Sequence, residues 1–325
     1  MSFYWKARTL LSGDYREIER NMIAYHNEKV VKRYKGKSDI YCVIRLFSDE
    51  GGLFCLFFKA IAGISYALQN GYIPVIDMQT KENIFVTKAD RKHINAWEYF
   101  FEQPSGVSFQ QIKDKPNKIV LENPMGPADI FRLEAVPEHV KYWRTLCRKH
   151  IHYSKEVKEL ISQYEGMFQA DDKVLGVLAR GTDYLNPGVG HPVQPDGREV
   201  ISRTKELMKQ YHCNKVFVAT EDEAILRQME MEFGSSLMYV EQKRYQGMQA
   251  DKLGHLSDYK QDAISMNQAY LTAMYYLAQC DCFFGGLTTG TVGVYLLSDG
   301  FERFEYWYKG THGESDAKTL DIHKL

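Results

Sequence analysis

The sequence lacks the patterns that mark several common classes of protein. It has no Walker A motif and no GxGxxG motif, which counts against P-loop kinases and dinucleotide enzymes. Lys+Arg (41) and Asp+Glu (42) balance to a net charge of -1, so the basic excess of a general nucleic-acid binder is missing. The six cysteines include no CxxC pair or metal-ligand spacing, which predicts reduced thiols. Nothing marks the nucleophile elbow or zinc site of a hydrolase.

A hydrophobic run long enough to cross a membrane is also missing. The most apolar stretch, residues 53–68, is interrupted by Lys59 and is shorter than the ~20 residues of a membrane span. The first residues predict a polar amphipathic helix and not a signal peptide, so we expect a cytoplasmic protein. A basic cluster near residue 33 is typical of a solvated helix face, and its alternative role is contact with the anionic inner face of a membrane. Its members are Lys29, Lys32, Arg33, Lys35 and Lys37.

Hydrophobic and β-branched runs alternate with helical patterns along most of the chain. In the first half, a strand over residues 40–47, a Gly51-Gly52 turn, a helix over 53–69 and a strand over 73–78 form one strand–helix–strand unit. In the second half, four strand-then-helix units predict a doubly wound parallel sheet. The strands expected there are 174–179, 215–220, 237–240 and 282–285, and the helices are 198–211, 223–233, 258–279 and 289–297.

The intervening segment is less regular. Residues 138–164 predict one helix, and Trp97, Tyr99 and Phe101 alternate as they would along a short strand. Such aromatic side chains suit a sugar-binding groove, although burial of Trp97 in the core is the commoner outcome. We therefore expect an α/β chain of two Rossmann-like domains facing a ligand cleft, with the N-terminal domain over residues 1–160 and the C-terminal domain over 161–325.

Polar residues follow three predicted strands of the second half. Arg180-Gly181-Thr182-Asp183 follows the first, Thr220-Glu221-Asp222 the second, and residues 285–291 (GGLTTGT) the fourth. Because parallel strands bring their carboxyl ends to one edge, these segments predict a ligand site. A hydroxyl-rich helix start favours an anion, and a guanidinium such as that of Arg180 binds phosphate bidentately. The alternatives are that the threonines only cap the helix and that Arg180 pairs with Asp183 or Glu221.

These segments resemble the motifs of the GDP-fucose-dependent fucosyltransferases, most closely the α1,6 branch. Residues 177–183 (VLARGTD), with His191-Pro192 downstream, resemble the first motif, residues 217–222 (FVATED) the second, and residues 278–291 the third. The resemblance implies a GT-B fold, a donor nucleotide held by the C-terminal domain, no metal or other cofactor, and transfer with inversion. Arg180 falls on the arginine that holds the donor phosphates. We expect further donor contacts from Thr182, His191, Thr220, Asp222, Gly286, Thr288, Thr289 and Thr291.

The sequence departs from the family pattern at the base-binding end. The family's leading histidine falls on Leu178, its second arginine on Gly181, and its guanine-reading acid on Ala273, for which Asp262 is a poor substitute. The phosphate end is thus better matched than the base end. A glycosyltransferase with a different nucleotide-sugar donor is therefore an alternative, and a non-catalytic sugar-nucleotide-binding protein is another.

Inverting transfer calls for a general base to take the proton of the acceptor hydroxyl. Glu50, beside Asp49 in the glycine turn, is the first candidate, although both acids could instead cap the following helix. Asp183 is the second candidate, or else a structural partner of Arg180. With Arg180, these residues form the predicted catalytic group. The expected acceptor is a glycan or a lipid-linked oligosaccharide, as in polysaccharide biosynthesis, and no nucleic acid is expected as a partner.

Overall fold

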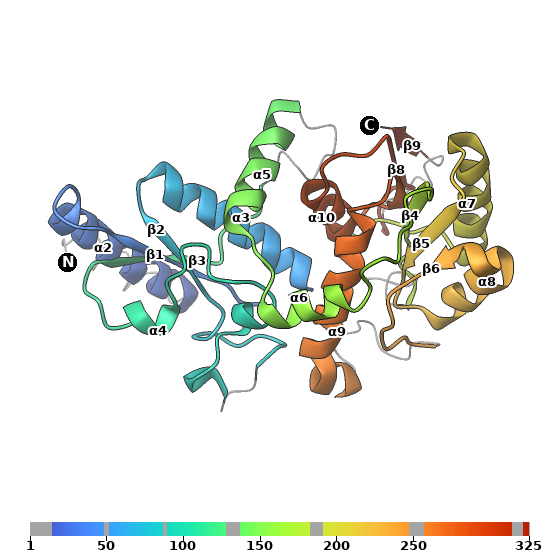
Figure 1. Ribbon diagram of the computed structural model, residues 1–325. Helices are drawn as coiled ribbons and strands as arrows, with labels where there is room; N and C mark the ends of the chain where they lie inside the picture. The colour runs from blue at the N-terminus through green and yellow to red at the C-terminus, as the bar shows by residue number, and fades with distance from the viewer. Residues whose placement is uncertain are drawn as a thin grey trace. The chain divides into compact units, whose positions relative to one another are not determined.

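The chain contains two compact units (Figure 1). The computed structural model describes residues 15–48, 52–86, 90–127, 137–182, 191–246, 257–313 and 321–324. Unit 1 comprises Met1–Asp49, Cys55–Pro127 and Lys149–His152, and unit 2 comprises Glu50–Phe54, Ala128–Arg148 and Tyr153–Leu325. Each unit has its own parallel sheet and is described separately.

Unit 1 is built on three parallel strands in the order β2-β1-β3. They are β1 (Tyr41–Arg45), β2 (Ile73–Asp77) and β3 (Lys118–Glu122), and Val43 of β1 lies opposite Val75 and Val120. The helix α3 (Leu53–Gln69) is rich in apolar residues and links β1 to β2. Two 3-10 turns, η1 (Asp90–Lys92) and η2 (Ala96–Tyr99), and the short α4 (Phe109–Ile112) precede β3.

The helix α2 (Tyr15–Tyr34) runs antiparallel to β3. The Asn27 side chain donates to the carbonyl of Val120 at 2.6 Å and accepts from its amide at 2.9 Å. Nearer the start of α2, Glu19 pairs with Lys81 at 2.6 Å, and Lys81 lies 3.8 Å from Glu122 at the far end of β3. The C-terminal half of α2 therefore lies at the amino ends of the strands.

The aromatic segment near Trp97 is helical, so the expected short strand there is wrong. Asn95 caps the 3-10 turn η2, and the Trp97 side chain is fully buried, packing on Phe101 with ring centroids 4.6 Å apart. The core role of Trp97, the commoner of the two alternatives, is the one that the structure shows. The sequence did not predict β3, a five-residue strand with a lysine at its start.

Unit 2 contains a six-stranded sheet in the order β6-β5-β4-β7-β8-β9, parallel except for β9. Because β4, β5 and β6 run outward in one direction and β7, β8 and β9 in the other, the sheet is doubly wound. The α/β parallel-sheet class predicted from the sequence is thus confirmed. The strands are β4 (Val174–Leu178), β5 (Lys215–Ala219), β6 (Leu237–Met238), β7 (Cys282–Gly286), β8 (Arg303–Tyr308) and β9 (Asp321–Lys324).

Helices cover both faces of this sheet. The helices α7 (Gly197–Tyr211) and α8 (Glu223–Phe233) bury their apolar sides on one face, in a core that includes Val177, Phe284 and Trp307. The helix α9 (Ser257–Leu277) covers the other face, where Tyr276 packs on Phe217 with ring centroids 6.0 Å apart. The helix α10 (Thr289–Leu297) follows β7. The strand and helix ranges expected for the second half agree with these bounds to within about two residues.

The structure divides a segment that the sequence predicts as one continuous helix. The single helix expected over 138–164 is two helices, α5 (Pro137–His150) and α6 (Lys155–Ser162), because the Ser154 side chain caps a new helix start.

The sequence did not predict the strand β8, because charged and aromatic residues alternate in it. Its Glu305 is fully buried, accepting from Arg203 at 2.8 Å and from the Tyr211 hydroxyl. Burial and this carboxylate raise the pKa of Tyr211 above its usual range.

All six cysteines are free thiols, in agreement with the expectation of reduced cysteines. Burial raises the pKa of Cys42 and of Cys147 to about 12, which disfavours the reactive thiolate at neutral pH. In the part of the chain that the structure describes, no helix has the length and apolar character needed to cross a bilayer.

Candidate functional site

The candidate site of unit 2 lies where the strand order reverses, between β4 and β7. These two strands are neighbours, and Leu178 of β4 lies opposite Gly285 of β7. Arg180 and Leu287 each follow two residues later, so the segments after the two strands begin side by side at the carboxyl edge. Open α/β sheets bind ligands at this position. The structure therefore brings the Arg180 segment and the threonine turn to one edge of the sheet.

The N-terminus of α10 starts in that turn. Thr288 is the N-cap, and its hydroxyl accepts from the Thr291 amide at 3.1 Å. The Thr291 hydroxyl is fully buried and donates to the Gly286 carbonyl. Two of the predicted donor-binding threonines thus hold the turn in shape, while Thr289 is half-buried at the first helical position. The structure therefore supports the capping alternative for Thr288 and Thr291.

This helix start differs from its neighbours in charge. Asp222 caps α8 and Asp196 caps α7, so each of those helices already has a carboxylate at its positive end. The first turn of α10 has no acidic residue, and its cap is a neutral hydroxyl. The partial positive charge of α10 is therefore not neutralised by an acid of its own first turn.

Glu221 organises the segment after β4. Its Oε1 accepts from the Gly181 amide and from the Thr182 hydroxyl, each at 3.0 Å, and lies 3.4 Å from Nε of Arg180. The Arg180 and Glu221 side chains are 16% and 12% exposed, so this ion pair is largely shielded from water. Thr182 has a left-handed backbone (φ 45°), which the bond to Glu221 helps to hold. The expected alternative in which Arg180 pairs with Glu221 is therefore present in the structure.

Asp222 occupies the space beside Gly181. Its Oδ1 accepts from the amides of Ala224 and Ile225, and its Oδ2 accepts from the Thr182 amide at 3.2 Å. A Cβ added at Gly181 would lie 2.6 Å from Cβ of Asp222, closer than real Cβ contacts allow. Position 181 therefore admits no side chain while Asp222 is present, which accounts for the missing second arginine of the fucosyltransferase pattern.

The other predicted site residues include a buried threonine and an exposed histidine. Thr220 is buried, and its hydroxyl accepts from the Asp222 amide at 3.1 Å. His191 is exposed, and its carbonyl accepts from the His312 amide at 2.9 Å, which pairs the 191–193 segment with residues 310–312. Glu50 and Asp183 lie outside the described residues, as does Asp49.

Sequence reasoning missed two charged residues near this edge. The sequence indicates Glu221 only as a structural partner of Arg180. Its three contacts reach residues about 40 positions earlier in the chain, so no local motif reveals its role. Arg244, after β6, has a side chain only 6% exposed, and it donates to the carbonyls of Gln242 at 3.1 Å and Val240 at 2.9 Å. An arginine after a strand of the same sheet was the available signal. No group of His, Cys, Asp or Glu within the described ranges has the arrangement of a metal site.

Comparisons with known proteins support the fold of this chain. No protein-family model matches the sequence, and no curated protein sequence matches it. Among solved structures, the fucosyltransferase NodZ from Bradyrhizobium aligns with 88% of this chain and 99% of its own, at a TM-score of 0.54 and 16% identity. The NodZ α-1,6-fucosyltransferase soaked with GDP-fucose aligns over the same shares at a TM-score of 0.53 and 15% identity. The resemblance to fucosyltransferases predicted from the sequence is thus confirmed at the level of the fold.

Proposed function

We propose that the chain is an inverting, metal-independent glycosyltransferase that transfers fucose from GDP-fucose to a hydroxyl of a glycan or a lipid-linked oligosaccharide. One observation carries the proposal: Arg180 and the acid-free N-terminus of α10 follow neighbouring strands at the reversal point of the sheet. The shared fold supports it, because the NodZ fucosyltransferase was studied with GDP-fucose and with GDP.

The proposed architecture is of the GT-B type, with two Rossmann-like domains and the donor in the C-terminal one. The boundary follows the sequence prediction, with an acceptor-side domain over residues 1–160 and a nucleotide-sugar domain over 161–325. The presence of a separate parallel sheet in each unit supports this division. In this architecture, unit 2 supplies the groups that hold the diphosphate.

The proposed reaction breaks the bond between the sugar C1 and the β-phosphate oxygen. Negative charge grows on the departing diphosphate, and the Arg180 guanidinium together with the free amides of α10 stabilises it. The acceptor hydroxyl attacks C1 from the opposite face, so a β-linked donor gives an α-linked product. Its proton passes to a carboxylate, Glu50 in first place or Asp183 in second.

We propose different tasks for the residues of the donor site. The half-buried Thr289 and the amides of the helix start contact the phosphates, while Thr288 and Thr291 preserve the turn that presents those amides. Thr182, Thr220 and Asp222 hold the segment that carries Arg180. His191 is proposed to contact the donor or the acceptor. Gly286, at the end of β7, is proposed to contact the donor.

A second candidate keeps the reaction and changes the nucleotide. Ala273, where the family has its guanine-reading acid, is a buried methyl group that is 2% exposed. Asp262, the substitute considered from the sequence, forms an ion pair with Lys243 at 3.1 Å. Neither position offers an unengaged carboxylate for guanine, which favours a donor with a different base.

Nucleotide binding followed by donor turnover tests these alternatives. We expect GDP, and not UDP, CDP or ADP, to raise the melting temperature, because a ligand at 100 times its Kd adds about 2.7 kcal/mol of stability. We expect GDP-fucose hydrolysis to continue in EDTA and to fall about 10²–10³-fold in Arg180→Ala, the usual loss when a group that stabilises a transition-state anion is removed.

The exposed Arg227, which pairs with Glu223 on α8, provides a matched control, and Arg227→Ala should retain full turnover. Stabilisation by UDP alone would refute the fucose donor. Binding of GDP without turnover by the unaltered protein would favour the non-catalytic alternative. Inhibition by EDTA that added metal reverses would refute metal independence.

A further inference from the structure

Unit 1 has a cluster of positive charge at the amino ends of its strands. Five cations come from the C-terminal half of α2 and the turn after it, and three come from the segment that runs from the end of α4 to the first residue of β3. The Asn117 side chain donates to the Asp39 carbonyl at 2.6 Å, and His26 lies 3.2 Å from the Lys118 carbonyl, so the two segments adjoin. We call the cluster the α2 basic surface. Its members are Lys29, Lys32, Arg33, Lys35, Lys37, Lys113, Lys115 and Lys118.

The local charge of this surface differs from that of the whole protein. Against its eight cations stand three acids within the same two segments, Glu28, Asp39 and Asp114, so the local charge is +5 in a chain whose net charge is -1. All members are exposed except Lys118, which is half-buried. The remainder of the chain is therefore acidic, and positive charge is concentrated on this end of unit 1.

No acid within the described ranges forms an ion pair with any of these eight cations. Three of them lie over aromatic rings instead: Lys29 is 4.5 Å from the Tyr25 ring centroid, Lys115 is 4.6 Å from that of Tyr41, and Arg33 is 5.2 Å from that of Tyr34. Lysines elsewhere behave differently, as in the pair of Lys205 with Glu232 at 2.5 Å. Like charges that lack acidic partners repel one another, so the binding of an anionic partner lowers the electrostatic free energy of this surface.

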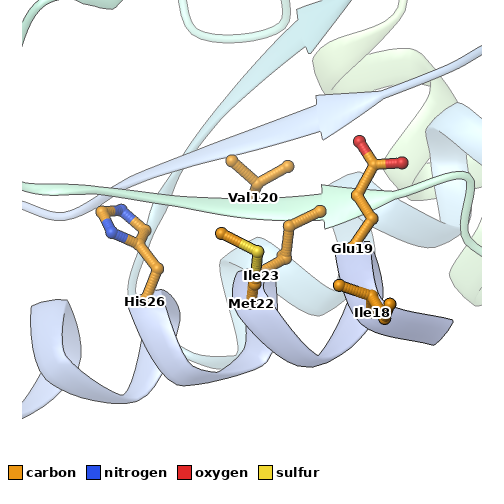
Figure 2. A pocket seen from close by; sticks show the side chains of 6 residues that line it. All are labelled: Ile18, Glu19, Met22, Ile23, His26 and Val120. Atoms are coloured by element: carbon orange, nitrogen blue, oxygen red, sulfur yellow. The ribbon is translucent and has the colours of Figure 1, made fainter. Parts of the chain in front are cut away.

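An apolar groove adjoins the basic surface on the same helix. It measures about 530 Å³ and lies between α2 and β3. Figure 2 shows the side chains of Met22, Ile23 and His26 extending from α2 toward the strand that carries Val120. Met22 is 54% exposed, and His26 lies one turn before Lys29. One helix thus presents an exposed apolar side chain at Met22 and, two to three turns later, the cations Lys29, Lys32 and Arg33.

We propose that the α2 basic surface docks unit 1 onto a membrane that contains anionic lipids. Cations beside exposed apolar side chains match the bilayer interface, where headgroups carry the negative charge and hydrocarbon begins a few ångströms deeper. A single-stranded nucleic acid fits less well, because it stacks its bases on aromatic faces, and one face of Tyr25 and one face of Tyr41 are already occupied by lysines. Docking by the amino ends of the strands leaves their carboxyl ends uncovered, which is the edge where such sheets bind ligands.

The test is sedimentation of the full chain with vesicles, which does not depend on any transferase activity. Two compositions are compared, pure phosphatidylcholine and phosphatidylcholine mixed with phosphatidylglycerol. We expect the protein to bind only the mixed vesicles and to dissociate as salt is raised, because salt screens exposed charges. Each cation at an anionic leaflet contributes about fivefold to affinity.

The variant replaces four exposed members: Lys32→Gln, Arg33→Gln, Lys35→Gln and Lys37→Gln. We expect its affinity to fall several hundredfold, to below detection. The control makes the same change of charge on unit 2, at Lys155, Lys158, Lys205 and Lys209, and should bind as the unaltered protein does. Lys32→Arg with Lys35→Arg keeps the charge and should also bind, which shows that charge and not local folding is responsible.

Several results would overturn the proposal. They are equal binding to neutral vesicles, equal loss of binding in the control, and no binding to either composition. Binding of a duplex DNA or RNA, lost in the α2 variant and without any vesicle binding, would assign the surface to nucleic acid instead. Met22→Gln should weaken vesicle binding severalfold and leave its salt dependence unchanged, because it removes only the apolar contact.

Discussion

The ion pair between Glu221 and Arg180 predicts a specific kinetic defect for Glu221→Gln. The substitution keeps the size of the side chain and an Oε1 that can still accept from Gly181 and Thr182. It removes the negative charge that lies 3.4 Å from Nε of Arg180. The guanidinium then loses an ion-pair partner that helps to orient it, while its own positive charge remains.

The magnitude follows from the burial of the pair. With the two side chains 16% and 12% exposed, the attraction is screened less than at an open surface, so it exceeds the value of about 0.2–1 kcal/mol that is usual for an exposed ion pair. Part of this is retained by the amide, so we expect a loss of about 1–2 kcal/mol in transition-state stabilisation. That corresponds to a fall in kcat/KM of about 5- to 30-fold.

The loss should appear in kcat more than in the affinity for GDP. Removing Glu221 also removes a negative charge near the proposed diphosphate site, and in the proposed complex this relief of repulsion offsets weaker positioning in the ground state. We therefore expect the Kd for GDP to change less than about threefold by calorimetry while kcat for GDP-fucose turnover falls about tenfold. Glu223→Gln, which alters a neighbouring helix acid paired with Arg227, serves as control and should change neither quantity.

A double-mutant cycle makes the reasoning refutable. Because Glu221 acts through Arg180, Glu221→Gln should have no further effect on turnover in an Arg180→Ala background. If the two losses add, Glu221 acts on its own, and its role as a positioning residue is wrong. An unchanged kcat in the single variant would refute the argument equally.

Two predictions concern stability and are measured as denaturant midpoints. Gly293→Ala places a methyl group inside the buried ring of Phe54, so we expect a loss of about 1–3 kcal/mol, whereas Gly52→Ala, with open space around it, should cost far less; equal midpoints would contradict this account. Glu305→Gln removes the charge of a fully buried carboxylate and leaves Arg203 paired with the exposed Glu206, for an expected loss of about 2–3 kcal/mol, whereas the exposed Glu302→Gln should leave the midpoint almost unchanged. A small effect at Glu305 would show that the buried pair is dispensable.

Much of unit 2 could be predicted because its strands are continuous apolar runs bounded by polar turns. A buried parallel strand such as β4 needs apolar side chains on both faces, and this pattern is visible in one dimension. The strand β8 could not be predicted in this way, because Glu305 is compensated by arginine and tyrosine side chains about 100 residues earlier in the chain. The break between α5 and α6 depends on one serine cap, a signal that is weak within a long polar helical pattern.

The candidate site was predictable to a similar extent. Arg180 and the threonine turn stand at strand ends, so sheet topology alone brings them to one edge. Which threonines stabilise the turn, and which is left to contact a ligand, could not be predicted, because this depends on which hydroxyl donates to the Gly286 carbonyl. The importance of Glu221 was hidden for the same reason, since its contacts are made across two strands.

The packing of Asp222 against Gly181 has an evolutionary consequence. Two positions that compete for one volume can change only together, so 181 and 222 should covary among related proteins. A relative with arginine at the first position would need a much smaller residue at the second, and would then need another cap for α8. Grafting that arginine into this chain would therefore require a compensating change 41 residues away.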